Sequence, residues 1–287
     1  MNGDAPLAYV ISAYRLPAQL VRLVDLLDEP TTSFVVSVDR RTDQATFAAM
    51  YQPLAGRRNV HFLARHSSPY RSFGHVRSTL RGIDHLLASG IAFDHLSVIT
   101  GQDLPIKPNA TIRRRLADAD GRGFMEHFPL PDERWSGGGL NRFSSLFIHT
   151  HNRNVSIGRR RFAGLIPPGF PFDVAPYGGS GYWTLPRDLV EWVHDFVRRN
   201  PAWVRFFRTT DMSDETFFHT ILMNSPHADR IVSDDLRLID WTDRTELPRI
   251  WRRADFDELA ASDDLFARKF DETVDAAVID RVIAELT

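Results

Sequence analysis

Short apolar runs alternate with amphipathic helical segments along about the first hundred residues, and this alternation restricts the possible folds more than any other feature. Runs typical of buried strands cover residues 7–12 (LAYVIS), 34–38, 60–63 and 96–100. Between them the apolar residues recur at helical spacing. A strand–helix–strand order of this kind indicates parallel strands joined by crossover helices. We therefore predict an α/β fold with a Rossmann-type mixed sheet flanked by helices.

The second half of the sequence has a different character. Residues 129–181 are rich in Pro, Gly, Arg and His, and we expect a long irregular region there. Beyond it the patterns predict a strand over residues 181–185, helices over 187–199 and from Ser213, a strand over 236–241 and a terminal helix over 273–286. Because no shift in composition marks a linker, we predict a single domain over residues 1–287.

Composition excludes several classes of protein. The absence of cysteine excludes disulfides, thiolate zinc sites and a cysteine nucleophile. A net charge of −2 provides no basic field for nucleic acid. The apolar runs are much shorter than the roughly 20 residues of a membrane span, and no signal peptide is visible after Met1. We expect a cytoplasmic protein that binds no nucleic acid, with peripheral contact at the inner face of the membrane left open.

Asp39 directly follows the second predicted strand. At the carboxyl edge of an open parallel sheet, where such sheets bind ligands, its carboxylate could accept a hydrogen bond from a ribose hydroxyl or a base N–H. It could equally form a turn before two arginines. The glycine fingerprint of dinucleotide folds is absent after the first strand, where Ser12 is followed by Ala-Tyr-Arg, and no Walker loop is present. A nucleotide would therefore be bound without these devices.

Two carboxylates, Asp214 and Glu215, occupy the first turn of the helix expected from Ser213. The helix dipole favours the ionised form of an acid at that position. A general base has to be ionised at neutral pH, so Glu215 is a candidate for that role. Acidic residues in a first turn also stabilise helices without any catalytic function, and both interpretations remain open from the residues alone.

Arg237 and Lys269 lie among apolar residues near the C-terminus. Arg237 alternates with apolar residues on a predicted strand, and large aromatic residues flank Lys269. Two fixed cations beside a cleft could neutralise a diphosphate leaving group, which is otherwise a task for a divalent metal. The alternatives are a surface arginine and a lysine paired with Asp271.

Two Asp-x-Asp sequences, residues 118–120 and 255–257, could hold a metal ion. Both are expected at helix ends rather than at strand ends that face a cleft, which favours a structural role. The histidines show no ligand spacing on one helix face. We therefore expect no metal and no other cofactor, with a metal-dependent enzyme that uses one Asp pair as the alternative.

Several segments taken together resemble the core-2/I-branching enzymes, glycosyltransferase family 14. The family contains β-1,6-N-acetylglucosaminyltransferases and peptide O-xylosyltransferases. The similar segments, besides Asp39 at a strand end, are residues 99–107 (ITGQDLPIK), 179–183 (GSGYW), 214–218 (DETFF), 236–241 (LRLIDW) and 266–271 (FARKFD). Residues 215–227 are especially similar to the xylosyltransferase branch. One segment departs from the family pattern, because residues 73–75 read Phe-Gly-His where the family has Trp-Gly-Gly.

The resemblance implies a GT-A-like fold and a metal-independent transferase that inverts the anomeric centre of a UDP-sugar. It implies that Glu215 deprotonates the acceptor hydroxyl and that Arg237 and Lys269 stabilise the departing UDP. The implied donor contacts are Ser12, Asp39, Arg71, Gly74 and Asp103. The implied acceptor contacts are Glu126, Arg134, Ser180, Trp183 and Trp241. The donor-binding half would cover about residues 1–128 and the acceptor-binding, catalytic half about residues 129–287.

The function that these expectations favour is transfer of a sugar, N-acetylglucosamine, from a UDP-sugar to a hydroxyl of a glycan or glycolipid acceptor. A UDP-xylose-dependent xylosyltransferase of the same family is one alternative. A non-catalytic protein that binds a nucleotide sugar or a glycan is another, because a fold does not determine a function.

Overall fold

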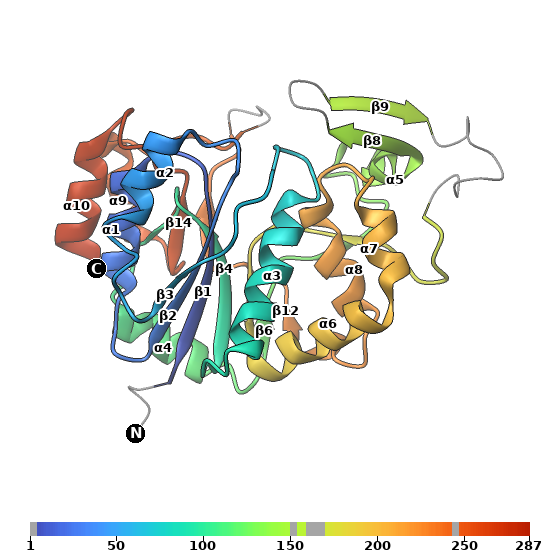
Figure 1. Ribbon diagram of the computed structural model, residues 1–287, viewed down its shortest axis with the longest axis horizontal. Helices are drawn as coiled ribbons and strands as arrows, with labels where there is room; N and C mark the ends of the chain where they lie inside the picture. The colour runs from blue at the N-terminus through green and yellow to red at the C-terminus, as the bar shows by residue number, and fades with distance from the viewer. Residues whose placement is uncertain (1–4, 150–153, 159–169, 243–246) are drawn as a thin grey trace.

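A seven-stranded mixed sheet runs through the centre of the computed structural model, which describes residues 5–149, 154–158, 170–242 and 247–287 (Figure 1). The strand order is β12-β6-β11-β4-β1-β2-β3. Four strands are parallel: β1 (Leu7–Ala13), β2 (Thr32–Val38), β3 (Val60–Phe62) and β4 (His95–Thr100). β11 (Trp183–Pro186) runs antiparallel to β4 and to β6 (Gly123–Phe124), and β12 (Ile231–Val232) is parallel to β6.

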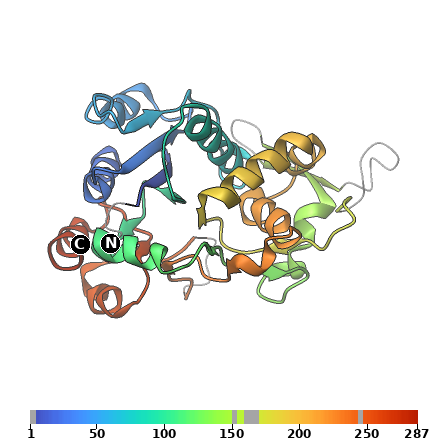
Figure 2. The same ribbon diagram turned by 90° about the horizontal axis from the view of Figure 1, so that it is seen from below.

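Helices cover both faces of this sheet, and each set encloses its own hydrophobic core (Figures 1 and 2). One face carries α1 (Pro17–Leu27), α2 (Gln44–Tyr51), α4 (Asn109–Ala117), α9 (Phe256–Ala261) and α10 (Ala276–Leu286). The opposite face carries α3 (Gly74–Ala88), α6 (Arg187–Arg199), α7 (Pro201–Phe207) and α8 (Phe217–Met223). The arrangement confirms the predicted α/β fold with helices on both faces.

Smaller elements surround the sheet. β13 (Arg237–Ile239), β14 (Phe266–Arg268) and β5 (Leu104–Pro105) form a three-stranded sheet, and β7 (Phe128–Pro129) pairs with β10 (Tyr177–Gly178). Short helical turns are η1 (Ser136–Gly139), α5 (Asn141–Ser144), η3 (Ser213–Glu215), η4 (Ala228–Arg230) and η5 (Arg253–Asp255). No helix within the described ranges is both long and apolar enough to cross a bilayer.

Local signals explain where several helices begin. Pro17 occupies the first turn of α1, where its missing N–H costs nothing. Asp43 caps α2 by accepting a hydrogen bond from the backbone N–H of Thr46. The helix expected from Ser213 begins later: residues 213–215 form a 3₁₀ turn and α8 starts at Phe217, while the Ser213 hydroxyl is buried without a hydrogen-bond partner among the described residues.

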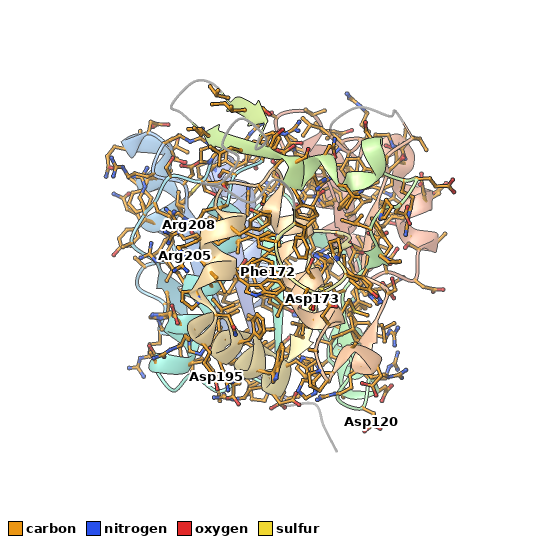
Figure 3. The ribbon with its side chains drawn as sticks, turned by 90° about the vertical axis from the view of Figure 1, so that its right-hand side faces the viewer. Asp120, Phe172, Asp173, Asp195, Arg205 and Arg208 are labelled. Atoms are coloured by element: carbon orange, nitrogen blue, oxygen red, sulfur yellow. The ribbon has the colours of Figure 1, made fainter. Side chains whose placement is uncertain are left out.

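The irregular region expected over residues 129–181 contains regular structure as well. β8 (Ser145–His149) and β9 (Asn154–Gly158) form a two-stranded hairpin that stands above α5 and α7 (Figures 1 and 3). Leu146 pairs with Ile157, and Ile148 with Val155. Two strands of five residues inside a polar, basic segment give too weak an alternating pattern to be predicted. Within this region, residues 150–153 and 159–169 lie outside the described residues.

Candidate active site

A cleft of about 1340 Å³ opens at the carboxyl ends of β1, β2 and β4. The parallel strands deliver loops to this edge, which is where open α/β sheets bind ligands. The other side of the cleft is built by η3, the loop before β11, and the small sheet of β13 and β14. Segments far apart in the sequence therefore contribute side chains to one cavity.

The cleft contains ten of the thirteen predicted site residues. These are Ser12, Asp39, Arg71, Glu126, Arg134, Ser180, Glu215, Arg237, Trp241 and Lys269. The three that do not line it are Gly74, Asp103 and Trp183.

Trp183 is a core residue rather than an acceptor contact. Its side chain is 1% exposed, and its ring packs edge-on against Phe218 at 5.1 Å between centroids. Neighbouring residues of an extended segment point to opposite sides, so Tyr182 faces the cleft while Trp183 faces the core. The aromatic residue of the GSGYW motif that lines the cleft is Tyr182 and not Trp183.

Asp103 and Gly74 lie behind the cleft wall. The Asp103 carboxylate is fully buried, accepts a hydrogen bond from the backbone N–H of Thr100 at 2.5 Å, and lies 3.6 Å from Arg268 Nη1. It therefore does not line the cleft itself, but its charge acts on three cations that do, Arg237, Arg268 and Lys269. At Gly74, a Cβ would lie 2.4 Å from Ser68 Cα, so glycine is required there for close packing rather than for ligand contact.

Asp39 combines the two roles left open by its sequence position. Its Oδ1 accepts a hydrogen bond from the backbone N–H of Arg41 at 2.9 Å, which is the expected turn, and its Oδ2 accepts one from Arg41 Nη2 at 2.8 Å. Burial opposes ionisation, but hydrogen bonds from Arg41 and Ser68 outweigh it and lower the pKa of Asp39. The carboxylate lines the cleft in its charged form, and its contact with a donor remains a prediction.

Three cationic side chains, Arg237, Arg268 and Lys269, are buried at the cleft wall, with exposed fractions of 5%, 9% and 8%. Arg237 Nη2 donates to the carbonyl oxygen of Val98 at 2.8 Å, and Arg268 Cζ lies 4.3 Å from the ring centre of Tyr182. Burial, together with Arg268 and Arg15, lowers the pKa of Lys269. Positive charge gathered in a poorly hydrated wall is suited to an anionic group.

Arg268 was missed by the sequence analysis, although it lies in the FARKFD motif. From this motif only Lys269 was predicted as a site residue. In the structure Arg268 also lines the cleft, with its guanidinium against the ring of Tyr182.

Glu215 ends the turn η3, and its side chain is 21% exposed. Burial raises its pKa to about 7, although Arg142 Nη1 donates to Glu215 Oε2 at 2.6 Å. Burial also raises the pKa of Asp214 to about 6. The helix dipole expected from the sequence is not the dominant influence on these two acids: the three-residue turn offers little dipole, and desolvation raises both pKa values.

The side of the cleft that carries Glu126 and Ser180 depends on a close backbone approach. A Cβ on Gly179 would lie 1.9 Å from the carbonyl oxygen of Glu126, so only glycine lets the two segments meet. His219 Nε2 lies within hydrogen-bond distance, 2.9 Å, of the Ser180 carbonyl oxygen in this segment. Burial lowers the pKa of His219 to about 3, which keeps its ring neutral.

Further polar groups surround this approach. Arg134 Nη1 lies 3.8 Å from Glu126 Oε1, and Arg134 Cζ lies 3.6 Å from the ring centre of Phe128. Asp235, which was not predicted, also lines the cleft, and burial raises its pKa to about 6. Trp241 is 53% exposed at the rim. Charged, aromatic and carboxyl groups of this kind are typical of polar ligand sites.

Neither Asp-x-Asp sequence lines the cleft. Asp118 follows the last residue of α4, and Asp255 accepts a hydrogen bond from the backbone N–H of Arg252 at 2.9 Å. In the part of the chain that the structure describes, no group of three or more His, Asp or Glu side chains is arranged to hold a metal ion. The placement of the pairs agrees with the structural role favoured by the sequence.

Comparisons with known proteins point to one family. The family model described as "Branch: Core-2/I-Branching enzyme" matches residues 7–260. Xylosyltransferase 2 of Canis lupus familiaris is 29% identical over 224 residues, which cover 71% of this chain and 25% of that protein. Xylosyltransferase 2 of Rattus norvegicus is 27% identical over 305 aligned residues, 96% of this chain and 33% of the relative. The chain thus spans between a quarter and a third of the length of these relatives.

Proposed function

Because the chain belongs to the Core-2/I-Branching enzyme family, we propose that it is a glycosyltransferase that moves a sugar from a UDP-sugar to a hydroxyl of a glycan acceptor. The observation that carries the proposal is that Glu215 and the three buried cations, Arg237, Arg268 and Lys269, line the same cleft. A base for the acceptor and positive charge for the leaving group are the two requirements of such a transfer. The xylosyltransferase relatives support the same class of reaction.

In the proposed reaction the acceptor oxygen attacks C1 of the donor sugar while Glu215 takes the hydroxyl proton. The bond between C1 and the phosphate oxygen breaks, and its electron pair leaves with UDP. A single displacement of this kind inverts the anomeric centre. A carboxyl with a pKa of about 7 is well matched to proton transfer near neutral pH.

We propose that the leaving diphosphate is stabilised by side chains and that no metal is required. Arg237, Arg268 and Lys269 bring three positive charges to the wall of the cleft. Such preorganised charges stabilise a developing negative charge without solvent reorganisation. Behind them the buried carboxylate of Asp103 partly balances Arg268.

The proposed donor sugar is N-acetylglucosamine, and the proposed acceptor is a glycan or glycolipid. The names of the relatives favour xylose as a second candidate donor. Both donors carry UDP, so the diphosphate site would serve either one. Contacts with the sugar itself would have to discriminate between the two donors.

Thermal unfolding in EDTA with a panel of UDP-sugars tests this proposal. A ligand at about 100 times its Kd adds roughly 2.7 kcal/mol of stability, which raises Tm by several degrees. We expect such a shift with UDP-N-acetylglucosamine, whereas a shift with UDP-xylose alone would identify the second donor.

Two outcomes would contradict parts of the proposal. A rise in Tm that requires manganese would contradict metal independence and favour a metal site at one of the Asp-x-Asp pairs. An unchanged Tm with every UDP-sugar would contradict the proposed donor class. Release of UDP in the presence of donor then separates an enzyme from a protein that only binds.

A further inference from the structure

The indole of Trp135, which lines the same cleft as the candidate base, Glu215, packs closely against Gly139 and Gly178. A Cβ on Gly139 would lie 2.6 Å from Trp135 Cε3, and one on Gly178 would lie 2.5 Å from its Cη2. Phe128 packs edge-on against the indole at 5.0 Å between ring centroids. Gly139 also adopts a φ of 78°, which side chains rarely permit. A side chain at either glycine position would therefore occupy the space that the indole of Trp135 fills.

Arg142 contacts both Trp135 and Glu215. Its Cζ lies 3.5 Å from the ring centre of Trp135, and its Nη1 donates to Glu215 Oε2 at 2.6 Å. The two charged side chains are 13% and 21% exposed. A guanidinium is planar, so stacking on the indole leaves its edge free to donate to the carboxylate. The orientation of Glu215 is thus linked through Arg142 to Trp135.

Two further carboxylates, Asp214 and Asp211, act on Glu215 with the same sign of charge. Asp214 and Asp211 both raise its pKa, in addition to the effect of burial, and Arg142 opposes them. Asp211 is itself paired with Arg71, whose Nε donates to Asp211 Oδ1 at 2.8 Å. His219, on α8, has a lowered pKa and is therefore neutral. Among the residues that the structure describes, Arg142 is the cation that contacts the candidate base directly.

We propose that Arg142, seated on Trp135, is a positioning residue that holds the Glu215 carboxylate in the orientation and charge state that a general base needs. It binds Oε2 and leaves Oε1 for the acceptor hydroxyl. This inference rests on the proposed function, in which Glu215 takes the acceptor proton. Arg142 itself takes no part in bond making or breaking.

The test compares pH profiles of kcat/KM for Arg142→Met, Arg142→Gln and Arg142→Lys. Loss of an opposite charge at this distance raises the pKa of a carboxyl by about 1–3 units. In the Met and Gln variants we expect the fall of kcat/KM on the acidic side of the profile to occur at a pH about one unit or more higher than in the wild type. Lys keeps the charge, so in that variant the fall returns toward the wild-type pH. If Met disturbs folding, the polar Gln variant supplies the same comparison.

A second readout does not depend on turnover. Carbon-13 NMR of labelled glutamate follows the titration of Glu215, which is assigned by its absence in Glu215→Gln. The same upward shift is expected in the Met variant without any substrate. If wild-type protein showed no transfer but this shift remained, the proposed function would be wrong while the positioning role of Arg142 held.

Arg187→Met is the matched control. Arg187 also combines an aromatic neighbour, Phe93, with an ion pair, Glu191, but lies on α6 away from the cleft. We expect it to keep the wild-type profile. A fall of kcat/KM that stays at the wild-type pH in both Arg142→Met and Arg142→Gln would overturn the inference, whatever the loss of kcat.

Discussion

Replacing Glu215 by glutamine is expected to lower kcat by about 10²–10⁴-fold, because glutamine cannot accept the proton of the acceptor hydroxyl. The affinity for UDP should change little, since the diphosphate is assigned to Arg237, Arg268 and Lys269. In the wild-type enzyme the base works only when ionised. With a pKa of about 7, activity should therefore fall as the pH drops below 7 and level off above it. Steady-state kinetics and calorimetric titration with UDP check both parts.

Two variants control this experiment. Glu285→Gln makes the same chemical change in an ion pair with Arg281 on α10, and should leave the rate unchanged. Asp214→Asn alters the neighbouring carboxyl, which also lines the cleft. If Asp214→Asn abolished transfer and Glu215→Gln did not, the base would have been assigned to the wrong carboxylate. Retained turnover in Glu215→Gln, or loss of its UDP affinity, would equally contradict the proposal.

Replacing Lys269 by alanine is expected to weaken UDP binding by about 10–100-fold, since a hydrogen bond to a charged group contributes roughly 1.5–3 kcal/mol. Lys269 lies in the cleft wall and is only 8% exposed, so little solvent screens its charge. Uridine carries no phosphate, and its affinity should stay close to that of the wild type. Calorimetric titration with UDP and with uridine measures the difference.

The sequence supplies its own control for this variant. Lys107 is the other lysine of the chain and does not line the cleft. Lys107→Ala should bind UDP as the wild type does. Equal losses of UDP and uridine affinity in Lys269→Ala would show that the lysine supports the cleft rather than the diphosphate.

Local patterns were sufficient to predict much of the fold. The spacing of apolar residues predicted β1, β2 and β4 and the helices α1, α3 and α6, because periodicity is a property of neighbouring residues. It failed for the hairpin of β8 and β9, whose short strands depend on pairing with each other. Contacts between distant segments leave no such periodic signal.

For the site, the sequence by itself determined which acidic and basic side chains are available. Ordered motifs contain Asp39, Glu215, Arg237 and Lys269, and the structure brings all four to one cleft. The motifs could not show which of their side chains face the cleft. Tyr182 and Arg268 line the cleft, while Trp183 packs in the core. That choice depends on the strand's partners on both sides.

Only the tertiary structure decided the surroundings of Glu215 and the direction in which its pKa is shifted. Its position before a helix predicted an ionised acid, but removal of water raises its pKa. Its counterion, Arg142, comes from a glycine-rich segment that the sequence analysis described only as irregular. Ionisation depends on burial and on charges a few ångströms away. Those distances are set by folding, because residues 142 and 215 meet only when the chain is packed.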